Sequence, residues 1–297
     1  MKIGIPRGLF YYYFDNLWQE FFKEIDIDLI VSPKTNKEII NLGKQYSNDE
    51  MCLSIKNYIG HAVYLKDKCD YLLIPRIDNY GTYNQTCTNF LAIYDYLNNI
   101  IDQKIINYNI NINNGESDKK GLIDVARKLG ISKKKATLAY EIAYIKTNKN
   151  QKRKKQDNYH KLDSKKIKVL LVSHSYNTHD EFIGVPLVKM LEKQQVEVIY
   201  SDSFDSVITE NNPLAPHLYW KYSRDMFESI KKFANRIDGI IFLSTFPCGL
   251  DSLANELVMR NITIPYLNLV FDDIDSLTGI ETRIESFIDI LKQVTII

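Results

Sequence analysis

KIGIPRGLFYYYFDNLWQEFFKEI, residues 2–25, contains the pattern of a short strand followed by that of a helix. Apolar and polar residues alternate through residues 2–6, which is typical of a strand. Large apolar residues then recur at helical spacing, namely Phe10, Phe14, Trp18, Phe21, Phe22 and Ile25. A strand followed by an amphipathic helix is the repeating element of α/β proteins, so these residues favour that fold class.

The same alternation of strands and helices continues along the chain. Strand patterns with branched or apolar residues occur at 27–31, 71–74, 105–112, 167–172, 196–200, 239–243 and 266–270. Helical patterns occur at 36–43, 53–63, 119–129, 133–145, 184–193 and 284–291, with a glycine near the end of the first. Strands that alternate with helices predict parallel sheets covered on both faces. We therefore predict two doubly wound lobes, Rossmann-like or flavodoxin-like.

A basic segment, residues 148–166, separates the two halves. It is rich in Lys and Arg and has no strong apolar pattern, so we predict a solvated connector. The predicted domains are an N-terminal lobe at 1–147 and a C-terminal lobe at 167–297. No aromatic platform accompanies the basic run at 152–155, which argues against a nucleic-acid site there.

Composition places the chain among soluble globular proteins. It has 297 residues, 45% hydrophobic and 25% charged, with a formal net charge of +1. This charge gives no support for a nucleic-acid or membrane-surface partner. No leader is recognisable and no apolar run reaches the length of a membrane span, so we expect a cytoplasmic protein. In that reducing compartment, the four cysteines need an explanation other than disulfides.

Three of the four cysteines precede predicted helices. Cys52 follows an acidic turn, Cys87 follows the polar loop 76–86, and Cys248 follows a strand and a turn. A helix N-terminus presents free amides and partial positive charge, which stabilise a thiolate or an anionic cluster. Cys69 differs because it stands at the start of a strand, remote from the end where ligands bind in such sheets.

Other features narrow the choice of site. Asp251 is expected to be the N-cap of the helix that follows Cys248. Free cysteine often only packs in a core, and the absence of any C-x-x-C pair excludes local zinc-ribbon, thioredoxin and ferredoxin patterns. His174 and His179 border the loop after the first strand of the second lobe. That loop has no glycine-rich phosphate-binding motif, so an ATPase or dinucleotide-dependent oxidoreductase is rejected.

Several short motifs occur in a fixed order along the chain. They are KIGIPR at 2–7, SPKTN at 32–36, DEMC at 49–52, Lys56 with GH at 60–61, IPR at 74–76, Cys87, FPCGLDS at 246–252 and TRIESF at 282–287. In these motifs the chain resembles the 2-hydroxyacyl-CoA dehydratase and CoA-substrate-specific enzyme activase-related family. Its relatives include benzoyl-CoA reductase subunits and double-cubane-cluster proteins.

The resemblance implies an oxygen-sensitive iron–sulfur cluster in the cleft between the lobes, as expected in an anaerobe. The cluster would be 4Fe-4S or a sulfide-bridged double cubane, with Cys52, Cys87 and Cys248 as metal ligands. Three thiolates leave one iron position for water, substrate or bridging sulfide. The resemblance also implies a separate ATP-dependent activase as the electron donor and a small molecule or a partner as the acceptor.

Four further residues are candidates for contact with the cofactor, each with an alternative. Lys56 lies one helical turn after Cys52 and would place positive charge near a cluster, or it is a solvated lysine. His61 would be a proton or hydrogen-bond donor near the cluster, or a satisfied histidine at a helix end. Arg7 and Arg76 follow strands and would bind a phosphate or carboxylate, or pair with Asp or Glu.

Two functions remain open at this point. The first is a dehydratase- or reductase-like redox protein. The second is a noncatalytic protein that binds, assembles or delivers a cluster. Ser54, Thr88 and Leu250 stand where the family often has proline, and residues 272–279 depart from its usual tail motif, which slightly favours the second function. Either function is compatible with a homodimer.

Overall fold

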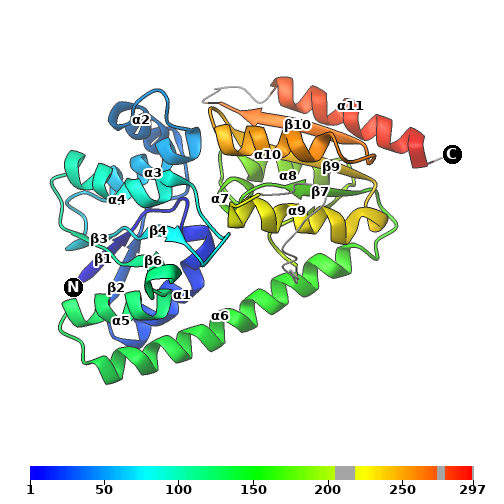
Figure 1. Ribbon diagram of the computed structural model, residues 1–297. Coiled ribbons are helices and arrows are strands. Elements are labelled where there is room, and N and C mark those ends of the chain that lie inside the picture. The colour runs from blue at the N-terminus through cyan, green and yellow to red at the C-terminus, as the bar shows by residue number, and fades with distance from the viewer. Residues whose placement is uncertain (205–217, 273–277, 296–297) are drawn as a thin grey trace. The chain divides into compact units, whose positions relative to one another are not determined.

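The computed structural model describes residues 1–204, 218–272 and 278–295. The chain divides into two compact units (Figure 1). Unit 1 consists of Met1–Gln151 with Tyr219–Lys221, and unit 2 consists of Lys152–Leu218 with Tyr222–Ile297. Most of the tail segment 272–279 lies outside the described residues.

Unit 1 is built on a parallel sheet of four strands in the order β2-β1-β3-β5. A second parallel pair joins β4 and β6. The strands are β1 (Lys2–Ile5), β2 (Asp28–Val31), β3 (Tyr71–Leu73), β4 (Arg76–Asn79), β5 (Ile105–Ile106) and β6 (Asn109–Asn111). The helices are α1 (Tyr11–Glu24), α2 (Lys37–Tyr46), α3 (Leu53–Tyr64), α4 (Thr88–Ile100), η1 (Ile112–Asn114) and α5 (Asp118–Lys128).

Unit 2 is built on a parallel sheet in the order β10-β9-β7-β8. The strands are β7 (Lys168–Val172), β8 (Glu197–Tyr200), β9 (Gly239–Thr245) and β10 (Tyr266–Phe271). The helices are α7 (Ser175–Thr178), α8 (Gly184–Lys193), α9 (Lys221–Phe233), η2 (Ala234–Arg236), α10 (Gly249–Met259) and α11 (Thr278–Thr295). When the strands are numbered within their own sheet, each four-stranded sheet has the order 2-1-3-4. The predicted α/β class with parallel sheets is confirmed.

The core of unit 1 follows from the amphipathic pattern of its first helix. Trp18, Phe21 and Phe22 of α1 are buried at helical spacing, as the sequence predicts. The Trp18 indole N–H donates to the hydroxyl of Tyr108 at 2.9 Å, so this buried polar group is satisfied.

The two glycines of the α2–α3 pair explain a difference from the sequence prediction. Gly43 was expected near the end of its helix, but α2 continues to Tyr46. A Cβ at Gly43 would collide with the carbonyl oxygen of Lys56 in α3, and a Cβ at Gly60 with the carbonyl oxygen of Ile39 in α2. Both glycines therefore allow the two helix backbones to pack closely.

The segment at 148–166 differs from the predicted solvated connector. Helix α6 (Lys133–Lys161) runs through most of it without interruption (Figure 1). Residues 151–154 of this helix are exposed and lack an apolar stripe, whereas Ala136 near its start and Asn158 near its end are buried. A helix that is polar all round over part of its length escapes detection by hydrophobic periodicity.

Three other elements differ from those predicted. Residues 105–112 form two short strands, β5 and β6, instead of one. The polar loop predicted at 76–86 begins with strand β4, and helix α9 is absent from the predicted elements. Strand β4, RIDN, has few apolar residues, whereas the buried Met226, Phe227 and Ile230 of α9 do have helical spacing.

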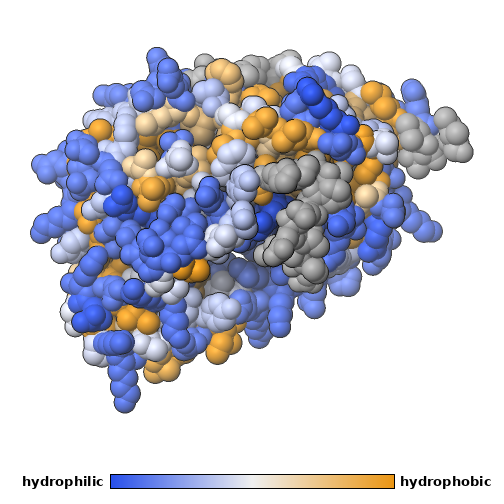
Figure 2. Space-filling view, in the orientation of Figure 1, coloured by the Kyte–Doolittle hydropathy of each residue, from blue (hydrophilic) through white to orange (hydrophobic). Residues whose placement is uncertain are grey.

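No helix among the described residues is long and apolar enough to cross a membrane. The face in Figure 2 mixes hydrophilic residues with separate hydrophobic ones. Exposed apolar side chains such as Leu138 and Ile145 of α6 are common on soluble proteins and need no special explanation singly.

Candidate functional site

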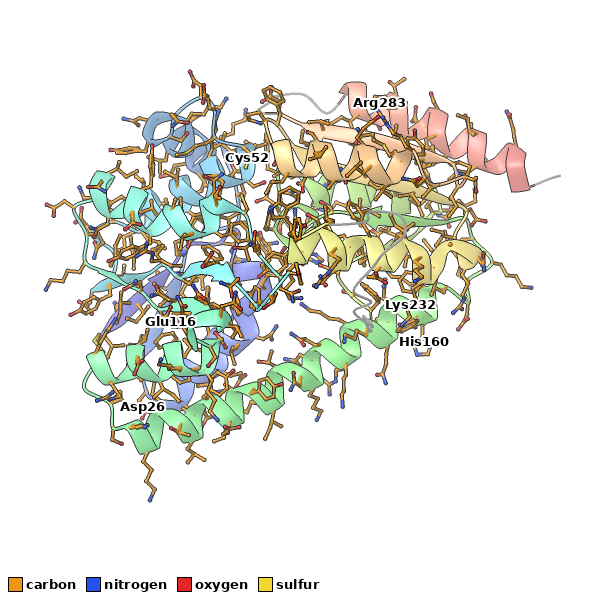
Figure 3. All side chains as sticks on the ribbon, viewed as in Figure 1. Asp26, Cys52, Glu116, His160, Lys232 and Arg283 are labelled. Atoms are coloured by element: carbon orange, nitrogen blue, oxygen red, sulfur yellow. The ribbon has the colours of Figure 1, made fainter. Side chains whose placement is uncertain are left out.

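Three cysteines are the N-cap residues of helices. Cys52 precedes α3 (Figure 3), Cys87 precedes α4 and Cys248 precedes α10. Each has an extended backbone, and each is half-exposed and free of disulfide bonds. The helix starts predicted for these cysteines are confirmed, so three thiols stand where unpaired helix amides are available.

The prediction that Asp251 is an N-cap is wrong. Cys248 takes that position, and Asp251 is the third residue of α10. The Asp251 amide donates to the Cys248 Sγ at 3.5 Å, a long bond to sulfur. The helix begins three residues earlier than expected because a thiol, not a carboxylate, occupies its cap.

The Asp251 carboxylate faces a buried histidine instead. Its Oδ1 lies 2.9 Å from the Nε2 of His174, and the two side chains are 4% and 8% exposed. Burial raises the pKa of Asp251, but the His174 ring and a hydrogen bond with the Cys248 thiol outweigh burial and lower the pKa below its usual value. Asp251 is therefore a buried, ionised group in contact with both His174 and Cys248.

This trio lies at the topological switch point of unit 2. His174 follows the first strand of the unit, β7, and Cys248 and Asp251 follow the third strand, β9. The two strands are neighbours in the sheet. In sheets of this order, ligands bind beyond the carboxyl ends of these strands. The His174 ring also stacks on Tyr176 at 4.8 Å between centroids, so its orientation is fixed from a second side.

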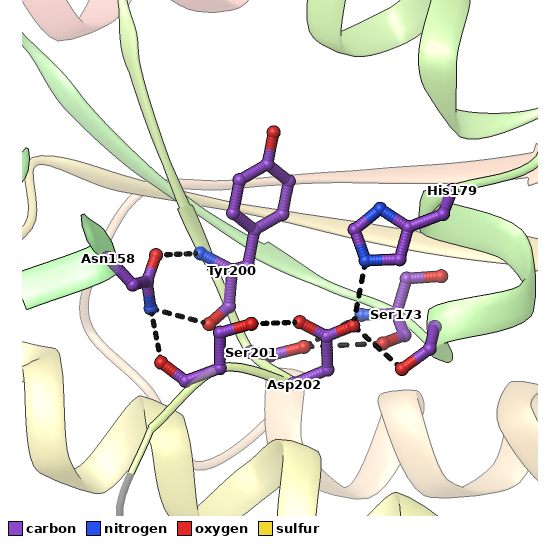
Figure 4. Close-up of polar contacts among 8 residues, drawn as sticks. Asn158, Ser173, His179, Tyr200, Ser201 and Asp202 are labelled. Carbon is purple, nitrogen blue, oxygen red and sulfur yellow. Dashed lines mark hydrogen bonds and ion pairs between the residues drawn. The ribbon is translucent and has the colours of Figure 1, made fainter. Parts of the chain in front are cut away.

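A second acid–histidine pair lies at the end of β8 (Figure 4). The Asp202 carboxylate is 3.0 Å from the Nε2 of His179 and accepts hydrogen bonds from the hydroxyls of Ser175 at 2.7 Å and Ser203 at 2.8 Å. Burial raises the pKa of Asp202, but these bonds outweigh it and lower the pKa to about 2. Sequence reasoning found both histidines but missed their acidic partners. The available signal was the position of Asp202 and Asp251 shortly after β8 and β9, the two parallel strands that flank β7.

Asn158 of α6 fixes the backbone at the same strand end (Figure 4). Its Nδ2 donates to the carbonyl oxygens of Tyr200 and Ser203, both at 2.9 Å, and its Oδ1 accepts from the Tyr200 amide at 2.8 Å. The Ser201 hydroxyl in turn accepts from the amide of Ser173 at 3.2 Å. The ends of β7 and β8 are therefore joined to each other and to α6.

In unit 1, His61 is wholly buried. Its Nδ1 is 2.9 Å from the Ser32 hydroxyl and its Nε2 is 3.0 Å from the Thr35 hydroxyl. Burial, and secondarily the charge of Arg7, lower the pKa of His61 to about 3, so the ring is neutral at physiological pH. Of the two alternatives for His61, the structure shows a histidine with both ring nitrogens bonded inside unit 1.

The two arginines bond to different groups. Arg7 donates its amide to the Ser32 hydroxyl at 2.8 Å and its Nε to the Ser32 carbonyl at 3.1 Å, with its guanidinium 5.0 Å from the ring centroid of Tyr11. Arg76 is the first residue of β4 and pairs with Asp95 of α4 at 2.9 Å. For Arg76, the alternative of pairing with an acidic side chain is therefore the one observed.

Lys56 and Cys69 complete the predicted set. Lys56 is half-buried in α3, and its amide donates to the Cys52 carbonyl at 3.0 Å, which places it one turn after the cysteine. Cys69 precedes β3, as predicted, and its thiol donates to the Leu65 carbonyl at 3.6 Å. Burial, with a smaller effect of Asp70, raises the pKa of Cys69. Cys69 therefore lacks the helix N-cap setting of the other three cysteines.

The candidate ligands Cys52, Cys87 and Cys248 carry thiols, the ligand type that iron–sulfur clusters take. Within the described ranges, no three His, Cys, Asp or Glu side chains are grouped closely enough to hold a metal ion. Cys52 and Cys87 belong to unit 1 and Cys248 to unit 2.

The fold and these residues define an α/β protein with two four-stranded parallel sheets and, among the described residues, three cysteine-capped helices. The chain belongs to the family described as "CoA enzyme activase uncharacterised domain (DUF2229)", whose model matches residues 2–204. The match includes Cys52 and Cys87 and ends before Cys248. No curated protein matches the chain.

Solved structures of metal-binding proteins give weak matches. The Cd-bound periplasmic metal binding protein of candidatus Liberibacter asiaticus is 12% identical, with 99% of each chain covered and a TM-score of 0.29. FpvC of Pseudomonas aeruginosa in complex with Mn²⁺ is 11% identical, with 98% of this chain and 97% of that chain covered and a TM-score of 0.30. Scores this low support no conclusion about function.

Proposed function

We propose that this chain is an iron–sulfur redox protein whose cluster is held by Cys52, Cys87 and Cys248. The observation that carries the proposal is that these three cysteines, none of them in a disulfide, are helix N-caps, whereas Cys69 is not. Amides at a helix N-terminus stabilise the negative charge of a thiolate-ligated cluster. Such a cluster would take two ligands from unit 1 and one from unit 2.

The cluster would supply one-electron chemistry, and the chain would supply ligands, burial and nearby charge. Three thiolates would leave one iron position for water, substrate or a bridging sulfide. His174 and Asp251 would hold the first turn of α10 in place, because the Asp251 carboxylate contacts both the His174 ring and the Cys248 thiol.

Membership of the CoA-enzyme-activase-related family supports a partnership with an ATP-dependent activase. The loop after β7, SHSYN at 173–177, has no phosphate-binding glycine motif, which is in keeping with ATP hydrolysis on a separate protein. We propose a dehydratase- or reductase-like role in the cytoplasm, where a reducing environment keeps cysteines out of disulfides.

A second candidate is a protein that stores or delivers a cluster without turnover. The half-exposed state of Cys52, Cys87 and Cys248 favours it, because an acceptor protein could reach the thiols. The two functions differ in what happens to the cluster. Reduction by an activase supports the first, whereas transfer to an apo-protein without substrate turnover supports the second.

Anaerobic purification with iron and sulfide analysis tests the site. Cys52→Ser, Cys87→Ser and Cys248→Ser should each lower bound iron and the visible absorption of the cluster. Cys69→Ser is the matched control and should retain the wild-type iron content. Full iron content in all three N-cap variants would contradict the assignment.

A further inference from the structure

Residues 219–222, here called the strap, contact the loop that leads to Cys87. The Gln85 amide donates to the Tyr219 carbonyl at 3.0 Å, and the Lys221 amide donates to the Gln85 carbonyl at 2.9 Å. These bonds make a parallel bridge between Gln85 and Trp220, two residues before Cys87. A segment from far along the chain thus pairs with this loop within unit 1.

Side chains reinforce the same pairing. The Tyr83 ring stacks on the Tyr219 ring with centroids 5.9 Å apart and planes at 26°. The Lys221 ammonium lies 5.8 Å from the ring centroid of Tyr80. On its other side the loop is fixed to β4, because Thr86 donates its hydroxyl to the Ile77 carbonyl at 2.6 Å. The loop before Cys87 is therefore held between β4 and the strap.

The last residue of the strap contacts the other cysteine site, within unit 2. The Tyr222 ring meets the His174 ring edge-on, with centroids 6.4 Å apart and planes at 84°. His174 is bound to Asp251, whose amide donates to the Cys248 sulfur. A chain of direct contacts thus leads from Tyr222 to Cys248.

A single peptide bond joins Lys221, which pairs with the Cys87 loop, to Tyr222, which packs on His174. We propose that the strap is a positioning element for the Cys87 and Cys248 thiols. It fixes the loop before Cys87 through main-chain pairing, and it fixes His174 beside Asp251 and Cys248 through a ring contact. Positioning these thiols serves a function only if they bind a cluster, so this role rests on the proposed function. The contacts themselves involve only the chain's own residues and can be tested without a cluster.

Lys221→Pro breaks the main-chain pairing selectively. Proline has no N–H, so the bond to the Gln85 carbonyl is lost, yet Lys221 is the first residue of α9, where proline is well tolerated. Lys221→Ala is the matched control, because it removes the side chain and keeps the amide. Hydrogen exchange of the Gln85 amide should accelerate in the proline variant only.

The measurement is the rate of iodoacetamide alkylation at each cysteine of the metal-free full chain, resolved by peptide mass spectrometry. Lys221→Pro should raise the rate at Cys87 at least threefold over Lys221→Ala. Tyr222→Leu, which removes the ring beside His174, should change the rate at Cys248 at least threefold. Cys69 lies away from the strap and should react at the wild-type rate in every variant.

Unchanged rates at Cys87 in Lys221→Pro and at Cys248 in Tyr222→Leu would overturn the strap. Accelerated alkylation at Cys69 as well would also overturn it, because that result indicates general unfolding. Different results would contradict the proposed iron–sulfur function and the proposed role of the strap. A wild-type chain that binds no iron anaerobically contradicts the proposed function, while the alkylation rates still decide the strap. Full iron content in both variants with unchanged rates rejects the strap alone.

Discussion

The two units share a strand order and one hydrogen bond between the ends of their first two strands. They differ in the side chains that surround this bond. In unit 1 the Arg7 amide, after the first strand, donates to the hydroxyl of Ser32, which follows the second strand. In unit 2 the Ser173 amide donates to the hydroxyl of Ser201, which follows the second strand there. In both units, therefore, a serine directly after the second strand accepts a hydrogen bond from a backbone amide after the first strand.

What surrounds that serine differs between the units. In unit 1 the neutral His61 is buried against Ser32 and Thr35. In unit 2 the nearby strand ends carry the buried carboxylate of Asp251 and the half-buried carboxylate of Asp202, each paired with a histidine. Buried charges with shifted pKa values are costly to keep and gather at functional sites. In unit 1 the serine hydroxyl is therefore hydrogen-bonded to the neutral ring of His61. In unit 2 the strand ends keep ionised carboxylates, and Asp251 among them contacts Cys248.

The largest effect should come from removing the carboxylate at the switch point of unit 2. Asp251→Ala leaves His174 without its partner, and breaking a buried pair by removing one member costs about 3 kcal/mol or more of unfolding free energy. Urea denaturation measures the change. The control, Asp289→Ala, removes an exposed carboxylate that pairs with Lys292 in the same unit, and should cost less than about 0.5 kcal/mol. Equal losses in both variants would show that the Asp251–His174 pair contributes no more to stability than an exposed pair.

The next effect concerns His61 and depends on pH. Its pKa is about 3 in the folded chain against 6.5 for an unperturbed histidine, so the unfolded chain takes up a proton first as the pH falls. The stability contribution of His61 is therefore present above pH 6.5 and lost progressively towards pH 3. Below the pKa of the unfolded chain, the free energy of unfolding falls by about 1.4 kcal/mol per pH unit for one proton. Between pH 7 and 5 the loss is therefore roughly 2 kcal/mol.

His61→Gln abolishes this titration. The variant should be less stable than wild type by about 2 kcal/mol at pH 7, because two buried hydroxyls lose a well-placed partner. Its stability should fall less between pH 7 and 5, so the two curves should converge. His160→Gln, at an exposed position of α6 (Figure 3), is the control and should keep the wild-type pH dependence. Parallel curves for wild type and His61→Gln would show that His61 titrates normally.

A smaller effect tests how unit 2 holds the end of its second strand. Asn158→Ala removes three hydrogen bonds to the backbone at Tyr200 and Ser203, and should cost about 1–2 kcal/mol. The Tyr200 amide should exchange with deuterium faster in this variant. Gln156→Ala, at an exposed position of the same helix, is the control and should leave that exchange unchanged. Slow exchange in both variants would show that β8 is fixed without α6.

Sequence alone predicted elements whose side chains have a regular period. Helix α8 was predicted at 184–193 and is found at Gly184–Lys193, because its apolar face is continuous. The C-terminal half of α6 was missed because its middle is polar all round, although Asn158 beyond it is buried against β8. Helix α9 has buried Met226 and Phe227 at helical spacing and was open to detection.

The candidate site was predicted in part for a similar reason. Cysteines that open helices are a local feature, visible from the strand or turn before them and the apolar spacing after them. The pairing of His174 with Asp251 spans 77 residues and depends on β7 and β9 being neighbours, which no local pattern states. The same holds for the strap, where Gln85 pairs with Trp220, which lies 135 residues further along the chain. Long-range register is thus the part that sequence periodicity does not contain.

The smallest effect is the coupling free energy of an ion pair that follows the third strand of unit 1. In unit 1, Arg76 and Asp95 form an ion pair with side chains 30% and 56% exposed, whereas His174 and Asp251 in unit 2 are 8% and 4% exposed. A double-mutant cycle on Arg76 and Asp95 should give a coupling free energy of about 0.5 kcal/mol, because solvent screens exposed pairs. High salt should reduce that coupling further, since mobile ions screen exposed charges. The same cycle on His174 and Asp251 should give a larger coupling that resists salt, because little water or salt reaches the pair. A salt-resistant coupling above about 2 kcal/mol for Arg76 and Asp95 would mean that unit 1 also keeps a protected charge at its strand ends, and the contrast between the units would then fail.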